Sequence, residues 1–259
     1  MEGACIGDPS LDIWGEGHDL LFDRASGALT GENASQRLLI FGRLPEPGVA
    51  KTRLVPFLSE EDASDLYQSF LDDALGIGNS IDALELWVPE RPRAFEKLSL
   101  RYPQSTVRLQ PEGSLGDKLV AAFEASFSEG IDYVLVVGSD HPTLPAEYLT
   151  EGFYALRRTS AVLGPTDDGG YYAVGLQRQT WPEASRLFSS APWSTPTLLQ
   201  WTRERAIKLG LLYEELPIWY DVDRPEDVWR MEDDLAIDSA TGRVWAAIKE
   251  RADPERGMM

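Results

Sequence analysis

Three basic residues lie close together in the segment GRLPEPGVAKTRL, residues 42–54. They are Arg43, Lys51 and Arg53, and Glu46 is the only acidic residue among them. A loop shaped by glycine and proline, rich in backbone N–H groups and cations, suits a phosphate group, because phosphate needs both neutralisation of charge and directional donors. The P-loop pattern G-x-x-x-x-G-K-[ST] is absent. A surface turn whose basic residues pair with an acidic body explains this segment about as well.

An aspartate follows the clearest apolar run of the chain, YVLVVG at residues 133–138. Asp140 stands where a carboxylate can hold a divalent cation against a nucleotide phosphate. Mg²⁺ keeps waters and phosphate oxygens in its shell, so one or two protein carboxylates suffice. The alternative is that Asp140 caps the turn ahead of Pro142. We expect the neighbouring His141 to be structural or solvated rather than a ligand.

Two further aspartates alternate in YDVDRPEDV, residues 220–228. On an extended segment Asp221 and Asp223 face the same side, so they could add one ligand to a cation already held by Asp140. Asp223 also stands just ahead of the helix expected from Pro225. We therefore expect Asp223 to act mainly as a helix cap and Asp221 to be the better ligand.

The segment GPTDDGGYYAVG, residues 164–175, contains a sharp turn. Gly169 and Gly170 after Asp168 indicate a backbone that passes close to another group or takes a positive φ. A hairpin turn of this kind needs no function. If the turn is functional, Asp168 is a candidate base.

Short apolar runs alternate with stretches of helical periodicity, which predicts an α/β protein with a mainly parallel central sheet and helices on both faces. Ser59, with Asp62, and Ser114 are expected N-caps. In such sheets ligands bind beyond the carboxyl ends of the strands, so the loops above are where chemistry is expected. The strands are expected at residues 37–42, 83–88, 106–110, 133–138, 161–164 and 171–176. Helices are expected after Ser59, Pro92, Ser114, Pro145, Pro196 and Pro225.

The composition excludes several classes of protein. The chain has 259 residues and a net charge of −19, from 24 Lys+Arg against 43 Asp+Glu. Such a charge disfavours a nucleic-acid binder or a protein of anionic membrane surfaces. A single cysteine and two histidines exclude a disulfide framework and a thiolate or histidine-rich metal site. With no apolar stretch long enough to span a membrane and no secretory signal, a cytoplasmic protein is expected.

Residues 1–36 show no sustained periodicity and are rich in Gly, Asp and Ser. We interpret them as an N-terminal extension, partly ordered or mobile. Residues 37–259 are interpreted as a single domain.

Taken together, FGRLPEPGVAKTRL, GSLGDKL, GSDHPTL, GPTDDGGYY, PWSTP and DVDRPEDV resemble the motifs of a bacterial GT-A-fold family described as glycosyltransferases. The family is related to the 2-phospholactate guanylyltransferases and, more distantly, to the molybdenum-cofactor guanylyltransferases. The resemblance covers residues 37–235 and implies a GT-A (nucleotide-diphospho-sugar transferase) fold. The first loop lacks the GxxxRMG-type pattern of the molybdenum-cofactor and sugar enzymes, so their acceptor is not inherited.

The resemblance also implies a role for individual residues. The implied nucleotide-binding residues are Arg43, Gly48, Lys51, Arg53, Gly113, Leu115, Gly116 and Ser139. Asp140 would bind the metal, with Asp221 or Asp223 as its partner. The implied acceptor side consists of Asp168, Gly169, Gly170 and Tyr171, and the implied catalytic residues are Lys51, Arg53 and Asp168.

Three functions remain open, all with a nucleotide ligand, and neither the base nor the acceptor is defined. The favoured one is nucleotidylyl transfer from a nucleoside triphosphate to a small phosphorylated acceptor, with Mg²⁺ (or Mn²⁺) and release of pyrophosphate. The second is glycosyl transfer from a nucleotide-sugar, which would need a base such as Asp168. The third is nucleotide binding without catalysis. We expect Lys51 to lie in a loop with little core packing, so that Lys51→Ala would leave the fold intact.

Overall fold

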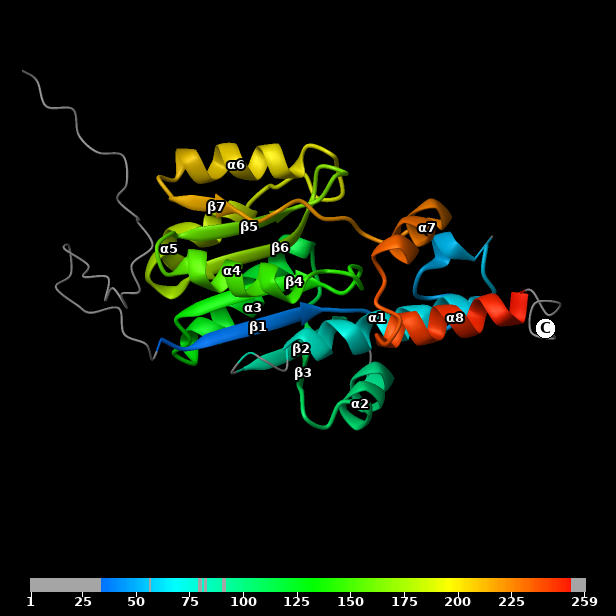
Figure 1. Cartoon of the computed structure of the whole chain (residues 1–259). Coiled ribbons are helices and arrows are strands. Elements are labelled where there is room, and N and C mark those ends of the chain that lie inside the picture. The colour runs from blue at the N-terminus through cyan, green and yellow to red at the C-terminus, as the bar shows by residue number, and fades with distance from the viewer. Residues whose placement is uncertain (1–33, 56, 79–80, 82, 90–91, 253–259) are drawn as a thin grey trace, which may run out of the picture. The chain divides into compact units, whose positions relative to one another are not determined.

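The computed structural model describes residues 34–55, 57–78, 81, 83–89 and 92–252 (Figure 1). Within them, seven strands form one sheet in the order β3-β2-β1-β4-β6-β5-β7. The strands are β1 (Gln36–Phe41), β2 (Leu84–Pro89), β3 (Thr106–Gln110), β4 (Tyr133–Gly138), β5 (Ala161–Pro165), β6 (Tyr171–Gln177) and β7 (Tyr213–Glu215).

The sheet is mainly parallel, as predicted. Strands β1 to β4 pair in parallel, and β7 is parallel to β5. Only β6, among the described strands, runs antiparallel to its neighbours β4 and β5. The strands that the sequence predicts as buried are apolar along their length because helices cover both faces; in β4, the first five residues are buried.

Helices alternate with strands from β1 to β5, and β6 then follows β5 directly. The helices are α1 (Glu60–Gly78), α2 (Pro92–Arg101), α3 (Leu115–Ser128), α4 (Ala146–Leu156), α5 (Trp181–Ala184), α6 (Leu198–Lys208), α7 (Pro225–Asp234) and α8 (Ala240–Ala252). The described residues also include short 3-10 helices at η1 (Thr52–Leu54), η2 (Arg178–Thr180) and η3 (Ser185–Phe188). None of the helices in the described part of the chain is both long and apolar enough to cross a membrane.

Two helix starts carry the N-caps that the sequence predicts. The hydroxyl of Ser114 accepts the backbone N–H of Asp117, whose carboxylate accepts that of Ser114 in return. At α1, Ser59 accepts the backbone N–H of Asp62 at 3.0 Å. Each cap satisfies N–H groups that have no partner within the helix.

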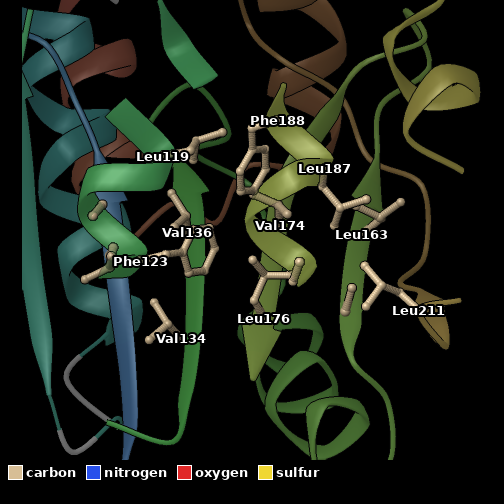
Figure 2. Close-up of a cluster of buried hydrophobic side chains, with 14 of the residues drawn as sticks. Leu119, Phe123, Val134, Val136, Leu163, Val174, Leu176, Leu187, Phe188 and Leu211 are labelled. Atoms are coloured by element: carbon tan, nitrogen blue, oxygen red, sulfur yellow. The ribbon is translucent and has the colours of Figure 1, made fainter. Parts of the chain in front are cut away.

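One face of the sheet holds the apolar cluster drawn in Figure 2. Side chains of β4, β5 and β6 meet residues of α3, η3 and the turn before β7. The labelled members are Leu119, Phe123, Val134, Val136, Leu163, Val174, Leu176, Leu187, Phe188 and Leu211. Alternate residues of β1 and β4, such as Leu38 and Leu135, are buried on the other face, where α1 and α4 pack on the strands. Burial on both faces fixes the register of the strands and hence the positions of their carboxyl ends.

One strand and two α-helices of the fold are not among the elements expected from the sequence. Strand β7 has only three residues, and α5 has four. Helix α8 packs along α1, and the carboxylate of Asp73 in α1 accepts the backbone N–H groups of Ala240 and Thr241 at its start.

The expected N-terminal extension lies almost wholly outside the described residues. At its end, the hydroxyl and backbone N–H of Ser35 lie 3.1 Å from a carboxylate oxygen of Asp132, and Gln36 begins β1.

Strand β1 lies between β2 and β4, so the chain leaves β1 toward one side of the sheet and later returns on its other side. This makes the carboxyl ends of β1 and β4 a topological switch point, where α/β sheets bind ligands. The basic loop follows β1, and Asp140 follows β4.

Candidate active site

Lys51 lies at the centre of the site. It precedes η1 with a left-handed backbone (φ 50°, ψ 37°), which is uncommon for a residue other than glycine. Its Nζ lies 2.5 Å from Oδ1 of Asp140 and 3.0 Å from Oδ1 of Asp223, and its side chain is 3% exposed. The expectation that Lys51 has little packing is therefore wrong, because its side chain is buried among two carboxylates and the rings of Tyr67 and Phe70.

Asp223 does not cap α7. Its carboxylate is shared between Lys51 and Arg53, whose Nη1 lies 3.1 Å from Oδ2. Asp227, inside α7, accepts the backbone N–H groups of Asp223 and Arg224 instead. The expected role as a cap is wrong because two cations from a distant loop bind this carboxylate.

Hydrogen bonds hold the segment that carries Asp221 and Asp223 against two other loops. The backbone N–H of Val222 donates to the carbonyl of Asp140 at 2.9 Å. Just before it, the backbone N–H of Trp219 donates to the carbonyl of Pro165 at the end of β5, and the carbonyl of Trp219 accepts the backbone N–H of Asp167. Acidic residues from three separate loops are therefore brought to one place.

The carboxylates of this cluster have unusual proton affinities. Burial raises the pKa of Asp221 to about 7, helped by the negative charges of Asp168, Asp140 and Asp223. Burial acts on Asp140 in the same direction, but the ammonium of Lys51 outweighs it and holds the pKa of Asp140 below its usual value. Lys51 thus stabilises the ionised form of Asp140, whereas burial and the neighbouring carboxylates disfavour that of Asp221.

His141 has a structural place, as expected. It is buried, its Nδ1 lies 3.0 Å from the carbonyl oxygen of Tyr220, and its ring meets that of Tyr172 edge to face. Burial lowers its pKa, which keeps the imidazole neutral at physiological pH.

Tyr67 of α1 belongs to the site although the sequence analysis did not select it. Its hydroxyl accepts the backbone N–H of Arg43 at 2.7 Å and lies 2.7 Å from the hydroxyl of Ser139. It therefore links the loop after β1 to the loop after β4. The sequence shows Tyr67 only as one more apolar position of a helix.

These residues surround a pocket of about 230 Å³. Its lining is dominated by polar and charged groups: Arg43, Ala50, Lys51, Thr52, Arg53, Tyr67, Asp140 and Asp223. Arg43, Lys51 and Arg53 thus share one pocket, which is the arrangement that a phosphate group requires.

Five of the implied nucleotide-binding residues do not line this pocket: Gly48, Gly113, Leu115, Gly116 and Ser139, whose buried hydroxyl contacts that of Tyr67 instead. Gly113, Leu115 and Gly116 lie at the start of α3, where Leu115 is 44% exposed. A Cβ on Gly116 would lie 3.0 Å from the carbonyl oxygen of Phe188, so packing accounts for that glycine. Gly48 has a φ of 71°, which accounts for a glycine there.

The implied acceptor side is only partly supported by the geometry. The negative charge of Asp168 helps to raise the pKa of Asp221. Oδ1 of Asp168 accepts hydrogen bonds from the Thr166 hydroxyl and from the backbone N–H of Gly170. Gly169 has a φ of 89°, as the turn predicts. Tyr171 does not present its hydroxyl to an acceptor: the hydroxyl is buried, because the ring packs against the apolar core.

The metal site stays a prediction. Within the described residues, no group of three or more His, Cys, Asp or Glu side chains is arranged to hold a metal ion. Asp140 and Asp223 approach each other through the ammonium of Lys51.

Comparisons with known proteins agree with this architecture. A family model described as "Uncharacterized protein conserved in bacteria (DUF2064)" matches residues 80–195. A protein from Desulfovibrio desulfuricans G20, assigned provisionally as a nucleotide-diphospho-sugar transferase, is 27% identical with a TM-score of 0.78. The alignment covers 86% of this chain and 98% of that one. The fold is that of the nucleotide-diphospho-sugar transferases.

More distant structures share the fold. A 4-diphosphocytidyl-2C-methyl-D-erythritol synthase is 15% identical over 80% of this chain and all of that one, with a TM-score of 0.52. The synthase from Anaerococcus prevotii DSM 20548 is 11% identical over 76% of this chain and 95% of that one, with a TM-score of 0.51. No curated protein matches the sequence.

Proposed function

We propose that the protein is a nucleotide-dependent transferase, and that it transfers a nucleotidyl group from a nucleoside triphosphate to a small phosphorylated acceptor. The observation that carries this proposal is the pocket at the switch point of the sheet, where Arg43, Lys51 and Arg53 meet the carboxylates of Asp140 and Asp223. Cations beside carboxylates suit a phosphate chain and the divalent cation that accompanies it. The similarity to the Desulfovibrio protein, assigned to nucleotide-diphospho-sugar substrates, supports a nucleotide donor.

The proposed reaction requires little of the protein beyond alignment and charge. A phosphate oxygen of the acceptor attacks the α-phosphorus of the triphosphate, a new P–O bond forms, and the bond to pyrophosphate breaks. Lys51, Arg53 and Arg43 would neutralise the charge that gathers on the leaving pyrophosphate. An acceptor phosphate is already ionised, so the reaction needs no general base.

A magnesium ion would suit the carboxylates of Asp140 and Asp221. Burial, and after it the carboxylates of Asp168, Asp140 and Asp223, raise the pKa of Asp221 to about 7, so a cation beside Asp221 would relieve their repulsion. Asp140 and Asp221 would hold the ion, with phosphate oxygens and waters as its other ligands. When bound, Mg²⁺ or Mn²⁺ would withdraw charge from the phosphate oxygens.

Glycosyl transfer from a nucleotide-sugar is the second candidate. The observation in its favour is the assignment of the Desulfovibrio protein. In that reaction a base must take a proton from an acceptor hydroxyl, and Asp168 has one carboxylate oxygen besides the one that its turn uses.

The two reactions are separated by a matrix of ligands. Each nucleoside triphosphate and several nucleotide-sugars are tested with Mg²⁺ for thermal shift, and for pyrophosphate release with small phosphorylated acceptors. Shifts with triphosphates and release of pyrophosphate are expected. Shifts with nucleotide-sugars alone would favour glycosyl transfer, and Mg²⁺-dependent binding without turnover would indicate a binding protein.

A further inference from the structure

The ammonium of Lys51 occupies the place between two carboxylates of the site. Its Nζ contacts Oδ1 of Asp140 at 2.5 Å and Oδ1 of Asp223 at 3.0 Å. The side chain is 3% exposed, whereas those of Asp140 and Asp223 are 29% and 40% exposed. The lysine is thus enclosed while its partners stay accessible from the pocket.

A divalent cation and this ammonium would compete for the same atoms. A cation on Asp140 would lie beside a buried positive charge if Lys51 stayed in place, and repulsion in a poorly hydrated site is strong. Lys51 would have to leave Asp140 before a cation could bind there tightly. A buried ammonium that leaves its partners needs another anion, because an unpaired buried charge is costly.

The pocket offers a place for that anion. Arg43, Thr52 and Arg53 line it together with Lys51, and Arg53 is 65% exposed at its mouth. The rings of Tyr67 and Phe70 lie 5.7 and 5.5 Å from Nζ. Contacts of this kind favour a positive charge near the rings, and Tyr67 also lines the pocket where a phosphate would bind.

We propose that Lys51 keeps Asp140 closed to a divalent cation until a nucleotide phosphate takes over its ammonium. This inference rests on the proposed function and adds that the two ligands bind cooperatively. The metal binds weakly by itself and tightly when the nucleotide is bound. Thermodynamic linkage requires that the nucleotide gains affinity from the metal by the same factor.

The test measures metal binding alone, without nucleotide or turnover. Mn²⁺ is titrated into the full-length protein and its free concentration is followed by electron paramagnetic resonance. The variants are Lys51→Met, which removes the ammonium, and Arg53→Met, which removes an equal charge that contacts Asp223 but not Asp140. Lys51→Met should bind Mn²⁺ about tenfold more tightly than the wild type, a factor typical of coupled sites.

The matched variant separates a blocked site from a general effect of charge. Arg53→Met should change the affinity for Mn²⁺ by much less than Lys51→Met. An equal gain in both variants, or no gain in Lys51→Met, would overturn the proposal. Should Lys51→Met fail to fold, Lys51→Gly replaces it, since glycine suits the positive φ at this position.

A parallel titration with nucleoside triphosphates in EDTA tests the proposed function separately. If the wild type binds triphosphates while Lys51→Met gains no affinity for Mn²⁺, the proposed function stands and the role of Lys51 is wrong. If no variant binds Mn²⁺ even with triphosphate present, the metal assignment fails, and this inference fails with it.

Discussion

The hydroxyl oxygens of Tyr67 and Ser139 lie 2.7 Å apart beneath the pocket that holds Lys51. The same tyrosine oxygen accepts the backbone N–H of Arg43, so one side chain of α1 joins the loops that follow β1 and β4. One buried hydroxyl therefore helps to fix these loops relative to each other, beside the ion pair of Lys51 with Asp140.

Replacing Tyr67 with Phe should loosen the phosphate pocket. The loss of buried hydrogen-bond partners should reduce the free energy of unfolding by about 1–3 kcal/mol, and affinity for triphosphates should fall with it. Urea unfolding and isothermal titration calorimetry measure the two effects. Tyr172→Phe is the control, because its hydroxyl binds the carbonyl of Pro217. It should lose stability but keep its affinity; an unchanged affinity in Tyr67→Phe would contradict this role.

Asp221→Asn should change how stability depends on pH in metal-free buffer. The pKa of Asp221 is raised in the folded protein to about 7 from an ordinary value of 3.8. The folded state therefore holds a proton that the unfolded chain loses, and this contribution to stability declines as pH rises from about 4 to about 7. Asp221→Asn removes this decline. As pH rises through this window, the variant should therefore become more stable relative to the wild type.

Urea unfolding at about pH 5 and about pH 8 measures that difference. Asp233→Asn, at an exposed position of α7, is the control and should show no such gain. A stability difference between Asp221→Asn and wild type that stays constant with pH would show that Asp221 ionises normally.

Gly169→Ala should destabilise the protein strongly. A Cβ there would lie 2.1 Å from the carbonyl oxygen of Pro196, and φ is 89°. Gly130 provides the control, because its φ of 88° is similar but nothing lies within 4 Å of a Cβ. Gly130→Ala should cost about 1–2 kcal/mol from backbone strain alone, and Gly169→Ala about 2 kcal/mol more from the clash. Equal losses in a denaturant titration would mean that the turn does not pack on Pro196.

Asp168→Asn distinguishes the two candidate reactions. Nucleotidylyl transfer to an ionised phosphate needs no base, so pyrophosphate release should fall by less than about tenfold. Glycosyl transfer to a hydroxyl would lose at least about a hundredfold, because the base is gone. Asparagine keeps an oxygen for the Thr166 hydroxyl and the Gly170 N–H, so the turn stays intact. Initial rates with saturating metal measure the effect.

The elements that position the site could be predicted because each has a local cause. The apolar run of β4 and the cap at Ser114 are visible in neighbouring residues. The ion pairs of Asp223 could not be predicted. Its position ahead of Pro225 is a local signal for a helix cap, whereas Lys51 and Arg53 come from a loop far away in the sequence. Burial of Lys51 follows from the same long-range pairs.

Other misses have different causes. Strand β7 is too short to show a period, and it forms because β5 offers an edge with which to pair. Helix α8 does carry a signal, since Thr241, Trp245 and Ile248 repeat at helical spacing and are all buried. Tyr67 contributes to the site through the hydrogen-bond partners of its hydroxyl. The apolar periodicity of α1 predicts that the ring is buried but does not predict those partners.

The pairing of Lys51 with Asp223 also bears on how the protein matures during synthesis. Six strands of the sheet and the crossovers between them separate the two residues along the chain. A chain emerging from the ribosome can therefore assemble most of its sheet before the pocket is complete. Any protection that a bound nucleotide gives against proteolysis would begin only after residue 223 has emerged.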